Sequence, residues 1–318
     1  MTTTAPARSQ AKGTLRLGDK VFSRTAVAAG LMILITLAAV SIFLIIRSIP
    51  AFGASSETAS ILPAGDNFWD YVWPLVFGTV WAAALALVMA TPVAIGIALF
   101  ISHYAPRRLA STLGYVVDLL AAVPSVVFGL WGILVFAPAV QPLYSWLVDN
   151  LGWFPLFAGP VSATGRTIFT AAMVLAVMIL PIMTAICREV FLQTPVLHEE
   201  AALALGATRW EMIRTAVLPF GRSGIISAGV LGLGRALGET MAVAMVLSAT
   251  PGLISFALLQ SANPQTIAAN IALSFPEAYG ININVLIATG LILFVVTFAV
   301  NAFARWIVSR RKDFSGAN

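Results

Sequence analysis

The sequence predicts an all-α, polytopic membrane protein with six transmembrane helices. Of the 318 residues, 59% are hydrophobic and only 10% are charged, and the mean hydropathy is +0.94. Six apolar runs are long enough to cross a bilayer, which takes about 20 residues of helix. This composition excludes a soluble domain, and the single cysteine, Cys187, excludes an intrachain disulfide or a cysteine-based metal cluster.

A basic tail over residues 1–24 precedes the first span, which is expected at 26–46. An apolar run of about 22 residues is too long for a signal-peptide core of about 7–15, so we expect an uncleaved span. A polar loop over 49–71 ends in an aromatic belt. The second span follows at 74–101 and is long enough to be tilted.

Proline interrupts the apolar runs in the middle of the chain. The third span is expected at 113–136, broken at Pro124 because proline removes a backbone hydrogen bond. A loop rich in Pro, Gly and Trp is expected over 137–166. The fourth span, at 167–187, carries Pro181.

The longest polar segment between two apolar runs is 194–219, and its pattern predicts two short helices. Thr194 is expected to cap the first helix, and Gly206 is expected to end it in a left-handed conformation. A capping box beginning at Thr208 predicts a second helix that ends before Pro219. Two capped helices that meet at a glycine suggest a docking element.

Two spans remain, at 223–248 and 283–307. The loop between them, 249–281, has a weakly apolar middle in which we expect a short helix at the surface. The chain ends in a short polar tail over 310–318.

The basic residues predict the orientation of these spans. All but three of the 18 Lys and Arg residues fall on one side of the six-span order, the exceptions being Arg47, Arg166 and Arg235. By the positive-inside rule this side is cytoplasmic, so the formal charge of +5 reflects topology and is no nucleic-acid footprint. We therefore expect cytoplasmic tails over 1–24 and 310–318, a six-helix domain over 25–309, and segment 194–219 in the cytoplasm.

Arg235 and Glu239 stand inside the expected fifth span. An isolated arginine at a helix centre costs about 2.5–3.5 kcal/mol, and a glutamate one turn away can pair with it. One interpretation is a structural ion pair. We favour a substrate pathway, in which Arg235 meets an anion and Glu239 holds the arginine in place, because planar guanidinium groups suit phosphate-like oxyanions.

Smaller polar residues offer further candidates for this pathway. Ser125 follows Pro124, where a tolerated kink and an oxyanion contact are both open interpretations; Thr240 is a weaker candidate. In the fifth span, Gly224, Ala228 and Gly232 recur every four residues, which predicts close packing against another helix.

Other chemistry is missing from the sequence. His103 and His198 have no partner at metal-ligand spacing, so we assign neither to a site. Neither a P-loop of the form G-x-x-x-x-G-K-[ST] nor a zinc motif is present. The chain is therefore expected to be no enzyme, and any ATP hydrolysis must occur in a partner subunit.

The docking segment resembles the EAA loop of ABC-importer permeases. The residues that carry the resemblance are Glu200, Ala201, Ala202, Gly206, Leu218 and Pro219, with Ala216 where isoleucine is usual. The stretches LLAAVPSVVFGLWGI (119–133) and GLGRALGETMAVAM (232–245) are similar to the phosphate-specific permeases of the Pst system. The second stretch is closer to the PstC-type subunit than to its PstA-type partner.

This resemblance implies a type I ABC-importer permease fold and a subunit that takes inorganic phosphate into the cytoplasm across a bacterial plasma membrane. The helices within 194–219 would be coupling helices that dock on an ATPase, and Arg235 and Glu239 would take part in phosphate passage. The implied partners are a PstA-like permease, two PstB-like ATPase subunits that bind ATP and Mg, and a PstS-like extracytoplasmic binding protein. No cofactor is expected in this chain, which contacts membrane lipid and no nucleic acid.

Three alternatives remain open at this stage. The first is a permease for another oxyanion, such as molybdate, sulfate or phosphonate. The second is an ion-coupled secondary transporter, which commonly contains inverted repeats; no convincing repeat is visible. The third is a sensory role, either alone or in addition to transport.

Overall fold

The computed structural model describes residues 17–309, so residues 1–16 of the predicted N-terminal tail and the whole predicted C-terminal tail, 310–318, lie outside the described residues. The prediction of a tail over 17–24 is wrong, because these residues are helical. The chain divides into two compact units, residues 1–46 and 47–318. Within the described part, six helical segments are long and apolar enough to span a membrane, as the sequence predicts.

The first unit contains one long helix, α1 (Leu17–Ser48), whose last residues belong to the second unit. The helix begins well before the expected start of the span at residue 26. Asp19 lies in its first turn, where a negative charge interacts favourably with the helix dipole.

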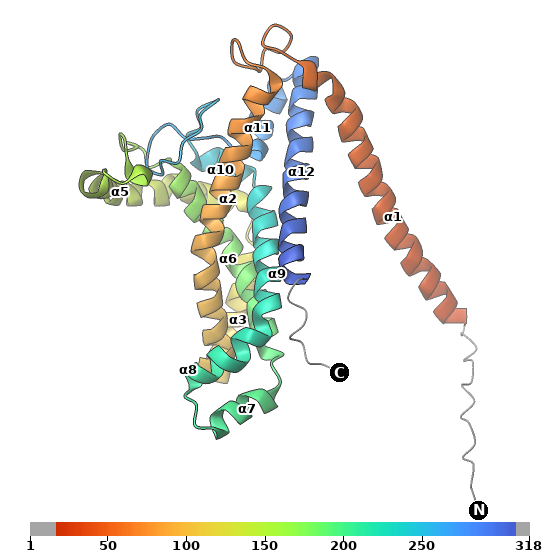
Figure 1. The fold of residues 1–318 in the computed structure, drawn as a ribbon, viewed down its shortest axis with the longest axis vertical. Coiled ribbons are helices and arrows are strands. Elements are labelled where there is room, and N and C mark those ends of the chain that lie inside the picture. Colours follow the sequence, from red (N-terminus) through yellow and green to blue (C-terminus); the bar gives the residue numbers. More distant parts are fainter. Residues whose placement is uncertain (1–16, 310–318) are drawn as a thin grey trace, which may run out of the picture. The chain divides into compact units, whose positions relative to one another are not determined.

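Helix α6 (Ile168–Leu192) lies at the centre of the second unit. It packs against α2 (Phe68–Leu99), α9 (Leu218–Leu237) and α3 (Arg107–Ala121), as Figure 1 shows. Along α2, five alanines spaced four apart are at most 1% exposed: Ala82, Ala86, Ala90, Ala94 and Ala98. Such small side chains let helix backbones approach closely, so α2 and α6 form a stiff core.

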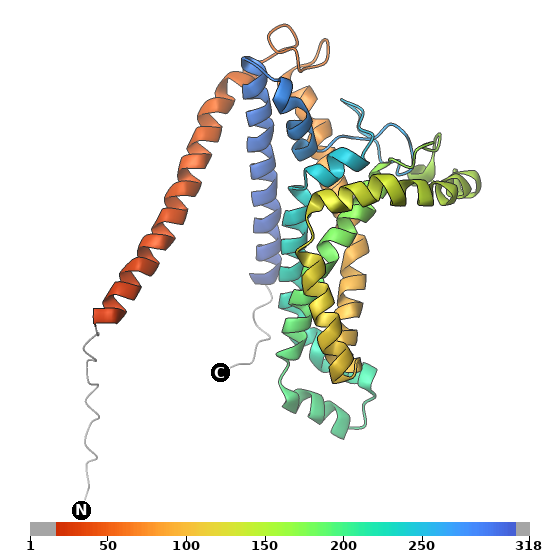
Figure 2. The ribbon, with the colours of Figure 1, turned by 180° about the vertical axis from the view of Figure 1, so that it is seen from behind.

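The third predicted span is divided between two helical segments. After α3, the chain continues through α4 (Ser125–Trp131), the π turn η3 (Gly132–Phe136) and α5 (Ala137–Leu151). The break at Pro124 is confirmed, and Figure 2 shows that the helix after it turns sideways from the bundle. The prediction of one span over 113–136 is wrong, because the segment long enough to span is Ser125–Leu151.

The expected loop over 137–166 is also wrong in its first half, which forms α5. Tyr144 anchors this helix: its side chain is fully buried and its hydroxyl lies 2.8 Å from Thr170 Oγ1 in a hydrogen bond. Pro142 is tolerated inside α5 on an exposed face. The prediction was based on the Pro and Trp content of this stretch and overlooked the apolar helix face that packs against the bundle.

The fifth predicted span, 223–248, is displaced in the structure. A continuous helix runs over Arg209–Leu237 and includes α8 (Arg209–Met212), the π turn η5 (Ile213–Val217) and α9. A short helix, α10 (Met241–Val246), follows after a break. The expected end of the second docking helix before Pro219 is therefore wrong. This proline lies in the first turn of α9, directly after the π turn, and the helix continues through it.

The short helix expected in the loop over 249–281 exists as α11 (Ile267–Ser274); its first half is buried, whereas Leu273 in its second half is 56% exposed. The backbone N–H of Ile267 donates to Thr79 Oγ1 (2.9 Å), and Asn270 Nδ2 donates to the Tyr71 hydroxyl (2.7 Å). These bonds fix α11 against α2. The last helix is α12 (Ile281–Ser309), and the remaining short turns are η1 (Ile49–Gly53), η2 (Phe100–Tyr104, a π turn), η4 (Pro155–Phe157) and η6 (Phe275–Glu277).

Candidate substrate pathway and docking segment

Arg235 lies in the last turn of α9. Its side chain is half-buried, and its Nε is buried without a hydrogen-bond partner. A buried N–H of this kind has lost its water and has gained no protein acceptor. Arg235 therefore retains unused hydrogen-bonding capacity inside the helical bundle.

Glu239 does not pair with Arg235. The expected pairing needs a helix that continues through residue 239, but α9 ends at Leu237. The Glu239 carboxylate is 9% exposed and instead accepts a hydrogen bond from the Ala242 N–H (3.1 Å), at the start of α10. Because its side chain satisfies an otherwise unpaired N–H of a new helix, the helix break is stabilised locally.

Ser125 and Thr240 lie at the starts of two neighbouring helices. A Cβ placed on Gly129 would lie 3.0 Å from the Ala242 Cα, and one placed on Gly132 would lie 2.8 Å from Val246 Cγ2. Helices α4 and α10 therefore run side by side in the same direction. By this register Ser125, one turn before Gly129, lies at the level of Thr240.

Ser125 and Thr240 thus lie at two neighbouring helix starts, and Arg235 and Glu239 lie within five residues of Thr240 along the chain, where α9 ends and α10 begins. Among the described residues, their side chains form no hydrogen bonds with one another. The helix that starts at Ser125 continues to Leu151, and its first N–H groups carry partial positive charge. Together with Arg235, this arrangement favours an anion.

The predicted close packing of the small residues is confirmed. A Cβ on Gly224 would lie 2.8 Å from the Val190 Cβ, and one on Gly232 would lie 3.0 Å from the Met183 sulfur. Ala228 is fully buried between them. This row of small residues faces α6, so α9 is held against the core up to the turn that carries Arg235.

Arg166 is a residue that the sequence analysis did not assign to a site. Its Nη2 donates to the carbonyl oxygens of Met245 (3.1 Å) and Leu247 (3.4 Å), at the end of α10. A positive charge at a helix C-terminus is stabilising. The sequence offered one indication of its importance, because Arg166 is one of the three basic residues that do not fall on the predicted cytoplasmic side.

Asn263 ties together the loops around Arg166. Its side chain is fully buried, its Nδ2 lies 3.0–3.2 Å from four carbonyl oxygens, including that of Arg166, and its Oδ1 accepts from the Ile168 N–H (2.8 Å). Arg166 and Asn263 together fix α10 at the end opposite Glu239.

The docking segment begins with α7 (Val196–Ala204). The predicted N-cap at Thr194 is wrong: Pro195 occupies the cap position without a side-chain bond, and Thr194 is buried with an unpartnered hydroxyl. The predicted end at Gly206 is confirmed, with φ +85°. The N–H of Gly206 donates to Leu203 O (3.0 Å) and the N–H of Ala207 donates to Ala202 O (3.2 Å), which is a Schellman motif.

The remaining motif residues occupy different surroundings. Glu200 and Ala201 are exposed on α7, whereas Ala202 packs against the bundle. The capping box at Thr208 is confirmed: the Thr208 hydroxyl accepts from the Glu211 N–H (3.3 Å), and the Glu211 carboxylate accepts from the Thr208 N–H (2.8 Å). Leu218 is partly buried and Pro219 is exposed.

Bulky apolar side chains project from the docking segment into the surrounding space. Leu205 is 90% exposed and Leu197 is 75% exposed, and Trp210 is also exposed. A segment that only connected two spans would not be stabilised by exposing large apolar side chains to solvent. This surface is therefore suited to contact with another protein.

His103, to which the sequence analysis gave no role, has a partner in the structure. Its Nε2 lies 3.4 Å from Glu199 Oε1 on α7, and its Nδ1 lies 2.7 Å from Ser102 Oγ. The pair joins positions 96 residues apart. No local sequence signal could have revealed it.

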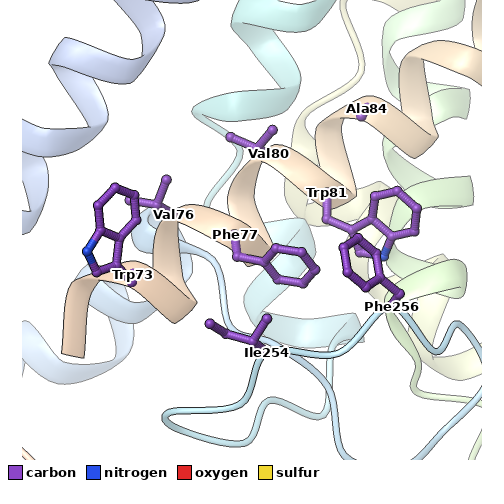
Figure 3. Close-up of a pocket in the computed structure, with 8 residues that line it drawn as sticks. All are labelled: Trp73, Val76, Phe77, Val80, Trp81, Ala84, Ile254 and Phe256. Carbon is purple, nitrogen blue, oxygen red and sulfur yellow. The ribbon is translucent and has the colours of Figure 1, made fainter. Parts of the chain in front are cut away.

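An apolar pocket of about 520 Å³ lies elsewhere. Figure 3 shows it between α2 and the loop that carries Ile254 and Phe256. The ring of Phe256 meets those of Phe77 and Trp81 edge-on, at centroid distances of 4.9 and 5.3 Å. No cation lines this pocket, so it does not suit an anion.

Comparisons with known proteins identify the family of the chain. Residues 90–313 match the family described as binding-protein-dependent transport system inner membrane component. A phosphate transport system permease protein, PstC 2, of Mycobacterium tuberculosis is 49% identical over 304 residues, which cover 92% of each chain. The phosphate transport system permease protein PstC of Mesorhizobium japonicum is 40% identical over 323 residues, covering 98% of this chain and 97% of the relative.

A solved structure shares the fold. A bacterial alginate ABC transporter, in complex with an alginate pentasaccharide-bound periplasmic protein, superposes with a TM-score of 0.61 at 17% identity. The alignment covers 93% of this chain and 96% of the other. The predicted permease fold and the resemblance to the Pst permeases are therefore confirmed, and the chain belongs to the family of binding-protein-dependent transport system inner membrane components, among the PstC-type phosphate transport system permeases.

Proposed function

We propose that this chain is one of two permease subunits in an ATP-driven importer that carries inorganic phosphate into the cytoplasm. The observation that carries the proposal is Arg235, a half-buried arginine at a helix break whose Nε has no protein partner. The names of the relatives, all phosphate transport permeases, support the same substrate.

In this proposal, Arg235 binds phosphate oxygens transiently through its planar fork of donors. Glu239 holds the start of α10 in place and adds a negative charge that moderates affinity for the anion. Ser125 and Thr240 supply hydroxyls at the same level. Weak contacts with phosphate suit transport, because tight binding of the ion would slow its release.

The docking segment would be the contact with the energy source. Glu200 and Ala201 are exposed on α7, and Gly206 ends the helix so that Leu205 projects outward. Ala202, Leu218 and Pro219 would connect this surface to the bundle. We propose that two PstB-like ATPase subunits, which bind ATP and Mg, receive these helices in a groove.

The remaining partners follow from this arrangement. A PstA-like permease would complete the pathway, and a PstS-like binding protein would deliver phosphate from outside the cell. The basic residues favour cytoplasmic termini and a cytoplasmic docking segment in a bacterial plasma membrane. The chain itself would bind no cofactor and contact lipid along its apolar surface.

The test is transport by the purified, reconstituted complex with its binding protein. We expect ATP-dependent uptake of labelled phosphate that excess unlabelled phosphate blocks. Sulfate, molybdate and a phosphonate serve as competing ions in parallel samples. Competition by one of these ions but not by phosphate would contradict the substrate, and ATP-independent uptake by this chain alone would contradict the importer mechanism.

A further inference from the structure

We propose that His103 is a positioning residue that fastens the docking helix α7 to α2 through Glu199, so that a movement of α7 reaches the α2–α6 core directly. The inference rests on the proposed function, since it assigns a route by which an ATPase drives this permease. It adds a second route beside the continuous helix that leads from α8 into α9.

The first argument is the surroundings of the two side chains. The His103 side chain is 10% exposed and that of Glu199 is 23% exposed, so both are largely withdrawn from water. The contact joins η2 to α7 across 96 residues of sequence. A partly buried pair is less screened than a surface pair, and removing one partner leaves the other without compensation.

The second argument is the way the imidazole is held. The Ser102 hydroxyl lies 2.7 Å from Nδ1 and 2.8 Å from the Ala98 carbonyl oxygen. When the hydroxyl donates to Nδ1, a neutral ring has its proton on Nε2 and donates it to Glu199. When the hydroxyl donates to Ala98, a ring protonated on both nitrogens makes the same link. The ring orientation is therefore fixed from both sides.

The third argument is the position of the pair in the fold. His103 lies in η2, the π turn that ends α2, and π turns frequently mark functional sites. Glu199 directly precedes Glu200, the first residue of the motif. The backbone of α7 packs against α8 and η5, whereas the His103–Glu199 pair ties it to the end of α2.

The core behind His103 can carry the movement. The alanine stripe of α2 continues to Ala98, one turn before His103, and packs without bulky side chains against the core. A displacement of α7 that pulls on Glu199 therefore acts on the end of a stiff helix. Without the pair, the main remaining contacts of α7 would be those with α8 and η5, besides its chain connection to the end of α6.

The test uses the whole complex with its ATPase and binding protein. His103→Ala, Glu199→Ala and the double variant are compared for phosphate imported per ATP hydrolysed. The matched control is Glu189→Gln, an exposed carboxylate at the same end of the bundle, whose hydrogen-bond partner Gln193 belongs to the same segment. His103→Gln is the conservative variant, because its amide N–H can replace Nε2–H.

We expect each alanine variant to raise the ATP hydrolysed per phosphate about two- to tenfold while the ATPase still co-purifies, and the double variant to match the single ones. His103→Gln should restore much of the coupling. Unchanged coupling in both single variants, additive losses in the double variant, or loss of assembly would overturn the inference. A wild-type complex that imports no phosphate would instead overturn the proposed function, whatever the variants do.

Discussion

At the scale of single residues, the main feature is that Arg235 and Glu239 do not pair with each other. Glu239 is engaged by the Ala242 N–H, so it leaves the guanidinium without an ionic partner in its own helix. The sequence correctly drew attention to both residues, since charges inside an apolar run are costly. It could not show that the glutamate caps a new helix, because the break at 238–240 depends on tertiary packing.

Arg235→Gln should abolish phosphate uptake while the complex still assembles. Two hydrogen bonds to a charged group contribute about 1.5–3 kcal/mol each, so their loss lowers transport more than about a hundredfold. Uptake into proteoliposomes and co-purification of the subunits measure the two effects. Arg222→Gln, an exposed arginine on the same helix, is the control. Persistent uptake in the Arg235 variant would contradict a pathway role.

Substitutions of Glu239 should separate its structural and electrostatic contributions. Glu239→Gln keeps an oxygen that accepts from the Ala242 N–H, so the complex should remain as stable as the wild type. Glu239→Ala removes the cap and should lower stability by about 0.5–2 kcal/mol. Thermal unfolding in detergent distinguishes them. Equal stability of the two variants would show that the carboxylate does not stabilise α10.

At the scale of elements, features set by neighbouring residues could be predicted and features set by distant contacts could not. The capping box at Thr208 and the left-handed Gly206 depend on a few consecutive residues, and both were predicted. Helix α5 depends on the burial of Tyr144 against Thr170, and its prolines misled the prediction. The pair of His103 and Glu199 joins segments that are distant in the sequence, so no local sequence pattern predicts it.

The contact between α9 and α6 gives a test at this scale. Gly224→Ala places a Cβ against Val190 and should destabilise the chain by about 1–3 kcal/mol. Gly229→Ala is the matched control, because its Cβ would meet only Leu87 Cδ1 at 4.0 Å. Thermal unfolding of both variants measures the difference. Combining Gly224→Ala with Val190→Ala should recover part of the loss; no recovery would mean that the two residues are not in contact.

At the scale of the whole molecule, one continuous helix connects the docking segment to Arg235. Segment Arg209–Leu237 begins beside α7 and ends with the turn of Arg235. The sequence predicted both sites and their order, but it divided this helix before Pro219. A single helix is a more direct connection than the expected helix–loop–span arrangement.

Disruption of the docking surface should separate ATP hydrolysis from transport. Glu200→Lys reverses an exposed charge, and Gly206→Asp introduces a side chain where φ is +85°. A non-glycine residue in this region costs about 1–2 kcal/mol, less for Asp, and the added charge changes the surface as well. We expect loss of the ATPase on purification or ATP hydrolysis without uptake. Normal co-purification with normal uptake would refute the docking role.

The π turn at Ile213–Val217 has a geometric consequence for this helix. Such a turn holds one residue more than an α-helical turn, so it sets the rotational phase between the segments on either side. Deleting Ala216 would therefore restore α-helical pairing and leave the docking end and α9 in about the same relative rotation, because the π turn already accommodates the extra residue. Rewinding η5 to α-helical geometry with all of its residues retained would instead rotate the docking end by about 100° relative to α9, with a shift of about 1.5 Å.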